Sequence, residues 1–195
     1  MLNGLRTFFV KEHVGFLKLA DVYDILDPGT QAQVAIAKEE PPAWAKYLRL
    51  VVNKTLLPTQ VNVYEHPQGA LLFSIRKPGF FSPKVHVLDA SGASLGHFKT
   101  KSFSFSGGFW VHDQQGERMA ELKGDWKGRN FKFLAVDGTE LGTVTQKWAG
   151  LGKELFTSAD NYMIDIHEMK EGQDLANVLL LAAGLAVDVV YKEGR

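Results

Sequence analysis

The stretch Asp174–Tyr191, DLANVLLLAAGLAVDVVY, decides which folds are open to this chain. As a helix it is apolar on every side from Val178 to Val187, so no face is left for water and protein or lipid must enclose it. Leu175–Val187 spans about 20 Å at 1.5 Å per residue, well short of the ~30 Å hydrocarbon core of a membrane. The sequence therefore predicts a central core helix over residues 174–190, with a membrane anchor as the less favoured alternative. The helix residues predicted to pack against the core are Leu175, Val178, Leu179, Leu181, Ala182 and Leu185.

Upstream of this helix, most of the chain consists of short runs rich in Val, Ile and Phe, bounded by Pro, Gly and Asp, which is typical of strands. Asp89, Asp113 and Asp137 lie 24 residues apart, each at the end of an apolar run and before a glycine-containing turn. Asp and Gly supply the local hydrogen bond and the positive φ that tight hairpins need. We expect one mainly-β domain over residues 1–195, a closed antiparallel barrel of about twelve strands. Such a barrel is too wide for its own side chains to fill, so the terminal helix is its expected plug.

A second, short helix is predicted over residues 42–53, because Pro41-Pro42 is followed by AWAKYLRLVVNK. Trp44, Tyr47, Leu48 and Val51 fall at helical spacing on one face. We expect this apolar face to dock on the barrel.

The composition excludes several classes of function. Lys and Arg together number 22, as do Asp and Glu, and the formal net charge is zero, which argues against a nucleic-acid partner. With no cysteine in the 195 residues, disulfides, thiolate metal sites and cysteine nucleophiles are excluded. The first residues lack the pattern of a secretory signal, so the expected location is the cytoplasm.

No catalytic constellation is evident. Gly92-Ala93-Ser94-Leu95-Gly96 matches the G-x-S-x-G nucleophile elbow, but it lies within a predicted hairpin and precedes a strand instead of a helix. The histidines are scattered without metal-like spacing, although His86 and His97 flank one hairpin and could meet in space. We therefore expect no enzymatic activity, no metal and no cofactor.

Basic residues beside aromatic ones are the stronger candidates for a site. Lys99 and Lys101 are two residues apart, so they project from one face of a strand, with Phe98 and Phe103 nearby. Cations next to aromatic rings suit anionic lipid headgroups, while the alternative is a solvated outer face with core aromatics. The candidate lipid-binding residues are Arg76, Lys77, Lys99 and Lys101.

Residues 147–162 carry a family resemblance. They contain Lys147-Trp148-Ala149-Gly150 and then Lys153-Glu154-Leu155-Phe156-Thr157-Ser158-Ala159-Asp160-Asn161, and YMIDI and the apolar helix follow. In this order the elements resemble the C-terminal part of phospholipid scramblases and the related LURP-one proteins of the Tubby-like superfamily. The resemblance implies a twelve-stranded antiparallel barrel around a central C-terminal helix, and association with membranes or phosphoinositides.

The calcium-binding segment of the scramblases is altered here. In those proteins an acidic segment of twelve residues begins where this chain has Ser158 and ends where it has Met169. Counted from Asp160 instead, the third and fifth positions are Tyr162 and Ile164, which offer no oxygen suited to a hard cation. Asp160 is thus only a weak calcium candidate, and no tight site is expected.

The expected function is that of a non-enzymatic, cytoplasmic, Tubby-like binding module. Its expected partner is either an anionic phospholipid or phosphoinositide surface, which would place it at the membrane periphery, or another protein. The alternative is a phospholipid scramblase, and a monomer is expected in either case.

Overall fold

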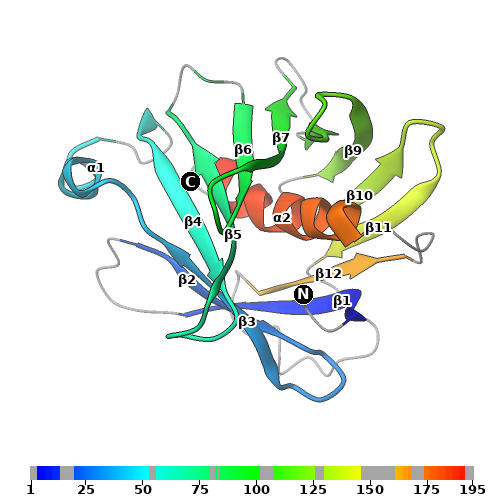
Figure 1. Cartoon of the computed structure of the whole chain (residues 1–195), viewed down its shortest axis with the longest axis horizontal. Coiled ribbons are helices and arrows are strands. Elements are labelled where there is room, and N and C mark those ends of the chain that lie inside the picture. Colours follow the sequence, from blue (N-terminus) through cyan, green and yellow to red (C-terminus); the bar gives the residue numbers. More distant parts are fainter. Residues whose placement is uncertain are drawn as a thin grey trace.

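The computed structural model describes residues 4–13, 20–52, 56–79, 82, 84–101, 108–125, 130–145, 161–167 and 174–191. Within these ranges twelve antiparallel strands close into one barrel, in which chain neighbours pair in order and β1 closes onto β12 (Figure 1). The strands are β1 (Thr7–Glu12), β2 (Val22–Leu26), β3 (Gln33–Glu39), β4 (Thr59–Tyr64), β5 (Leu71–Lys77), β6 (Lys84–Asp89), β7 (Ser94–Thr100), β8 (Gly108–His112), β9 (Arg118–Asp125), β10 (Asn130–Ala135), β11 (Glu140–Thr145) and β12 (Tyr162–Ile166). The predicted mainly-β, closed antiparallel barrel is confirmed.

The terminal helix α2 (Asp174–Tyr191) runs through the barrel, as Figure 1 shows. Leu179, Leu181 and Ala182 are fully buried, Val178 and Leu185 are nearly so, and Leu175 packs at the margin of the same core. Inward-facing residues of every strand surround it, because strand side chains alternate between the two faces of the sheet. The predicted core helix is confirmed to within one residue of its ends. In the part of the chain that the structure describes, no helix is long and apolar enough to cross a membrane.

Small residues let the helix and the strands approach closely. A Cβ atom on Gly184 would lie 2.5 Å from Cδ1 of Ile164 on β12, so a larger residue there would force the Ile164 side chain to move. Gly96 on β7 has φ +154°, and a Cβ there would lie 2.3 Å from the carbonyl oxygen of His112 and 3.1 Å from Leu179 of the helix. The helix therefore approaches β12 closely at Gly184, and it approaches β7 at a strand glycine, Gly96.

The aspartate–glycine turns all lie at one end of the barrel, which we call the hairpin end. Asp89 ends β6 and accepts backbone hydrogen bonds from Ser91 and Ala93, and Asp113 accepts one from Glu117. Asp137 differs, since it lies inside its turn, two residues beyond the end of β10, and accepts from Thr139. The 24-residue spacing thus repeats an aspartate that accepts hydrogen bonds in a turn, but this aspartate does not hold the same position relative to the strand end each time.

The opposite end of the barrel carries α1 (Ala43–Leu48) and is called the α1 end. The predicted helix over 42–53 is present only in its first half, and the prediction that its apolar face docks on the barrel is wrong. Trp44 is 58% exposed, Tyr47 72%, Leu48 40% and Val51 82%. The helix contacts the body through a different stripe, in which Ala45 is fully buried and the Arg49 side chain is 2% exposed.

Candidate functional site

The outer face of β5–β8 gathers basic side chains that are distant in sequence. The register places Arg76 opposite His86, His86 opposite His97, and His97 opposite His112. One step nearer the α1 end, Lys84 lies opposite Lys99. Directly opposed residues on adjacent strands share a face of the sheet. We call the outward-facing set Arg76, Lys84, His86, His97, Lys99 and His112 the cationic face.

Arg76, Lys84 and Lys99 are exposed. Among the residues placed in the structure, none of the three has a hydrogen-bonded or ion-paired acidic partner. Like charges directly opposite each other on neighbouring strands destabilise a sheet, so the Lys84–Lys99 pair costs stability in the isolated protein. An anion bound between the two ammonium groups would remove that cost.

The three histidines form a short stack. The rings of His97 and His112 are 4.7 Å apart between centroids and nearly parallel, at 4°, and those of His86 and His97 are 6.3 Å apart. The prediction that His86 and His97 could meet is confirmed, and His112 extends the row. His112 is fixed by Nδ1, which lies 3.0 Å from the carbonyl oxygen of Gly116.

Burial lowers the pKa of His97 below its ordinary value, and the nearby charges of Lys84, His112, His86 and Lys99 lower it further. At neutral pH the stack is therefore uncharged at its centre and is flanked by permanent cations. Any added proton would raise the positive charge of the cationic face.

On the β9 side of the cationic face, Glu121 neutralises the neighbouring basic side chains. Lys101 and Arg118 both pair with Glu121, the latter at 2.8 Å, and both cations also lie over the Trp110 ring, 5.5 and 5.6 Å from its centroid. Burial alone would raise the pKa of Glu121, but the hydrogen bond and charge of Lys101 outweigh it and lower the pKa. The carboxylate stays ionised and neutralises this border.

The four basic residues predicted as lipid ligands are therefore not equivalent. Arg76 and Lys99 both lie on the cationic face, whereas Lys101 is engaged by Glu121. Lys77 is the next residue after Arg76, and its cross-strand neighbour on β4 is the buried Thr59. It therefore belongs to the set of strand positions that face inward, and it makes contacts of its own. Consecutive strand residues point to opposite faces, so Arg76 and Lys77 could not both face outward.

The aromatic part of that prediction needs correction. Phe98 is fully buried and stacks on Phe109 inside the barrel, with centroids 5.2 Å apart, because it alternates with the outward-facing His97 and Lys99. It cannot contact lipid in this fold. Phe103, the other aromatic residue of the prediction, lies outside the described residues.

Sequence reasoning missed the contribution of Lys84 and the histidines to a common surface. The signal was present in two short alternating runs, where Lys84, His86, His97 and Lys99 face outward and Val85, Val87 and Phe98 face inward. It becomes a surface only through the strand register, which brings β6, β7 and β8 side by side.

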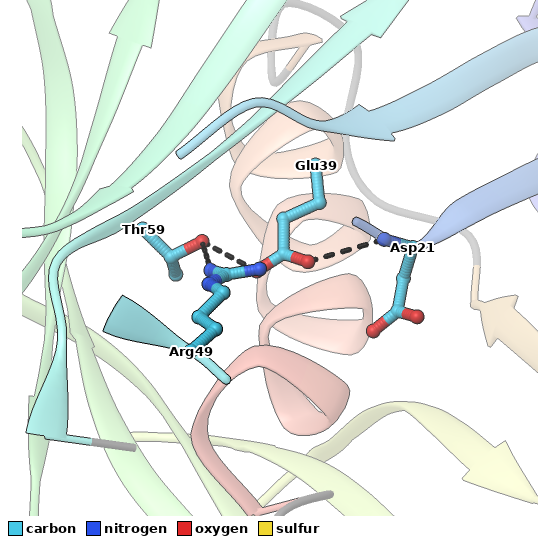
Figure 2. A network of polar contacts seen from close by, with 4 residues as sticks. All are labelled: Asp21, Glu39, Arg49 and Thr59. Atoms are coloured by element: carbon cyan, nitrogen blue, oxygen red, sulfur yellow. Dashed lines mark hydrogen bonds and ion pairs between the residues drawn. The ribbon is translucent and has the colours of Figure 1, made fainter. Parts of the chain in front are cut away.

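A second polar group fixes α1 on the barrel (Figure 2). Arg49 donates from Nη2 to Glu39 Oε1 at 2.5 Å and to Thr59 Oγ1 at 2.9 Å, and the Thr59 hydroxyl donates to the same carboxylate oxygen at 2.5 Å. The other oxygen of Glu39 accepts from the backbone N–H of Asp21 at 3.1 Å. Burial alone would raise the pKa of Glu39, but the hydrogen bonds from Arg49 and Thr59 and the guanidinium charge outweigh it and lower the pKa. We call Glu39, Arg49 and Thr59 the buried clasp.

Other candidate sites have simple structural explanations or lie outside the described residues. Ser94 of the G-x-S-x-G sequence opens β7 after a hairpin turn, without the helix that a nucleophile elbow requires. Tyr162 and Ile164 of the calcium segment are buried on β12, facing the core, whereas Asp160 lies outside the described residues. Over the described ranges no group of three His, Asp or Glu side chains is arranged to hold a metal ion.

Comparison with known proteins gives one finding. No curated protein matches the chain, and no solved structure matches it. The family model described as Scramblase matches residues 79–194, which include β6 to β12 and the core helix. This match covers more than half of the chain, and it includes most of the cationic face and the helix around which the barrel closes. The chain therefore belongs to the Scramblase family.

Proposed function

We propose that this protein is a non-enzymatic, Tubby-like binding module that docks on anionic phospholipid surfaces through the cationic face. The observation that carries the proposal is the opposed pair Lys84 and Lys99, which is exposed beside Arg76 and is paired with no carboxylate of the described ranges. Membership of the Scramblase family supports a lipid-related role. Phosphate groups of lipid headgroups would supply the missing counter-charge.

Binding of this kind is weak and depends on salt. Each basic residue near an anionic membrane surface contributes about 1 kcal/mol, and the attraction falls off within a Debye length. Peripheral association in the cytoplasm as a monomer is consistent with such an affinity.

Liposome co-sedimentation tests the proposal, with phosphatidylcholine vesicles that contain or lack phosphatidylserine or a phosphoinositide. Lys84→Glu/Lys99→Glu should weaken binding to the anionic vesicles by at least roughly thirtyfold, because two contributions of about 1 kcal/mol are lost. Lys123→Glu/Lys132→Glu is the matched control, since these lysines are also an exposed cross-strand pair but Lys132 is neutralised by Glu140. Equal pelleting of both variants and the wild type, or no pelleting at low salt, would contradict the proposal.

Phospholipid scrambling is the second candidate function, and family membership is the observation that favours it. It is tested with vesicles that carry a fluorescent lipid, whose outer leaflet is bleached chemically. Bleaching of more than the outer half in the presence of the protein would support scrambling. Anionic binding without loss of the inner half would support the binding module alone.

A further inference from the structure

Among the residues that the structure describes, the exposed large apolar side chains are concentrated in one short segment. Across the described ranges seven large apolar residues are exposed, and all but Val136 lie between residues 44 and 56. We call this group the apolar pad, and it consists of Trp44, Tyr47, Leu48, Leu50, Val51 and Leu56. Scattered apolar residues on a surface are ordinary, but a contiguous group marks a contact site.

The buried clasp explains why the pad faces outward. Ala45 and Arg49 are four residues apart and lie on one side of the segment, about a third of a turn from the stripe of Trp44, Tyr47, Leu48 and Val51. The guanidinium of Arg49 must reach Glu39 and Thr59, so the Ala45–Arg49 side turns inward. The segment is therefore held by a polar contact and displays its apolar side to the surroundings. This inverts the usual arrangement of an amphipathic helix on a protein surface.

The pad adjoins basic residues at the α1 end of the barrel. Lys46 is exposed within the segment. A Cβ on Gly79, two residues after Lys77, would lie 3.8 Å from the carbonyl oxygen of Leu56. β5 ends and β6 begins at this same end, where Lys84 and Lys99 lie opposite each other. The apolar pad and the permanent cations of the cationic face thus lie at the same end of the barrel.

We propose that the apolar pad inserts into the interfacial layer of an anionic phospholipid membrane, while Lys46, Lys84 and Lys99 contact its headgroups. This rests on the proposed lipid-binding function and adds the part of the molecule that enters the bilayer. Trp and Tyr side chains favour the membrane interface, and leucine and valine side chains gain free energy from apolar contact beyond it. The barrel then stands on its α1 end, with the hairpin end in solution.

Two features favour a membrane over a protein as the occupant. A stable protein interface buries about 800 Å² on each partner from some 20–30 residues, whereas the pad offers six large side chains on one segment. A second copy docked symmetrically on this face would bring Lys46 and the neighbouring lysines against their own copies, which is repulsive. A surface of anionic headgroups has the opposite charge.

A site-specific probe tests the insertion directly, because the chain contains no cysteine. Val51→Cys and Val136→Cys each receive an environment-sensitive NBD label. The two valines are a matched pair, 82% and 66% exposed, at the α1 end and the hairpin end respectively. With phosphatidylcholine–phosphatidylserine vesicles the label at position 51 should shift to the blue, brighten and be quenched by lipids spin-labelled near the headgroup. The label at position 136 should report water throughout.

The outcomes separate the two proposals. If the protein pellets with anionic vesicles while the label at position 51 stays in water, the insertion is wrong and the lipid-binding function stands. If nothing pellets, both are wrong. If the label at position 51 responds to protein concentration without vesicles, the pad joins two copies and the insertion is again wrong.

Substitutions in the pad give a second measurement. Trp44→Ser and Leu50→Ser remove exposed side chains, so melting temperatures should be unchanged, while binding to anionic vesicles should weaken by roughly tenfold for each change. The loss should persist at high salt, unlike that caused by changes in the cationic face. Val136→Ser is the control, and its binding should equal that of the wild type. Unchanged binding in both pad variants would overturn the proposal.

Discussion

Arg49→Met tests whether the buried clasp holds α1 on the barrel. Methionine keeps much of the apolar stem of arginine but removes the guanidinium. The carboxylate of Glu39, 8% exposed, then keeps only the Thr59 hydroxyl and the Asp21 N–H as partners. Breaking a buried ion pair by removing one partner costs about 3–5 kcal/mol, against a total stability of about 5–15 kcal/mol. For a chain of this length that corresponds to a fall in melting temperature of roughly 10 °C.

The pH dependence of stability gives the same experiment a second readout. In the wild type the pKa of Glu39 lies below its ordinary value of 4.5, so its contribution to stability is present above that value and is lost as the pH falls through the folded pKa. In Arg49→Met, burial is no longer outweighed and the folded pKa should rise. Glu39 would then favour the folded state only when protonated, and stability should fall as the pH increases through and above 4.5.

Urea unfolding at several pH values measures both effects. Arg49→Met/Glu39→Gln should be more stable than Arg49→Met alone, because no buried charge is left unpaired. Lys132→Met, which breaks the exposed pair with Glu140, should barely change the melting temperature. An Arg49→Met protein whose stability and pH profile match those of the wild type would refute the reasoning.

Four other results are expected. Leu181→Asp should abolish soluble folding, since it places an unpaired charge at a fully buried position of α2, and a soluble variant with unchanged melting temperature would contradict the interior placement of that helix. Binding to phosphatidylserine vesicles should strengthen as the pH falls below about 6.5 and through the lowered pKa of His97, because protonating His97 adds positive charge, and His97→Gln should flatten this profile. The same protonation removes the stability that His97 contributes above its unfolded pKa near 6.5, so the free protein should melt at lower temperature in acid. Calorimetry with calcium should show no site tighter than about millimolar, and a micromolar isotherm lost in Asp160→Ala would revive a scramblase-like calcium site.

Features that depend only on the local sequence of one helix or strand could be predicted. The helix Asp174–Tyr191 is apolar on all sides, so its burial could be predicted without knowing which strands pack against it. Several strands around it, such as β6 and β10, alternate between buried and more exposed residues, and turns containing aspartate and glycine mark strand ends. These signals are local and agree with one another, so the closed barrel followed from them.

The orientation of α1 could not be predicted, because it depends on a contact distant in the chain. The apolar stripe of α1, taken alone, favours docking of that stripe on the barrel. The helical periodicity cannot show that Arg49 is buried in an ion pair. What turns the segment round is a carboxylate on β3 and a hydroxyl on β4 that share a buried position beside it. A basic residue following a helix is usually solvated, so the burial of Arg49 could not be expected from the sequence.

The cationic face could be predicted from the sequence only in part, for a similar reason. Same-face spacing correctly grouped Lys99 and Lys101, but spacing within one strand cannot show that Glu121, two strands away, neutralises Lys101. It also cannot show that Lys84 is the cross-strand neighbour of Lys99. Those facts depend on strand register, which is set by the turns and the barrel closure together.

The net charge of zero hides an uneven placement of the turn aspartates and of several lysines along the barrel. Tight antiparallel turns favour aspartate, so the hairpin end collects Asp27, Asp89, Asp113 and Asp137, each accepting local backbone hydrogen bonds. Because the strands alternate in direction, the remaining connections lie at the α1 end, where Lys77, Lys84 and Lys99 are found. A net charge of zero therefore predicts little about how this molecule meets a charged surface. The exposed Lys46, Lys84 and Lys99 lie at the same end of the barrel as the apolar pad, so their attraction to an anionic membrane would bring the pad toward the lipid before any side chain enters it.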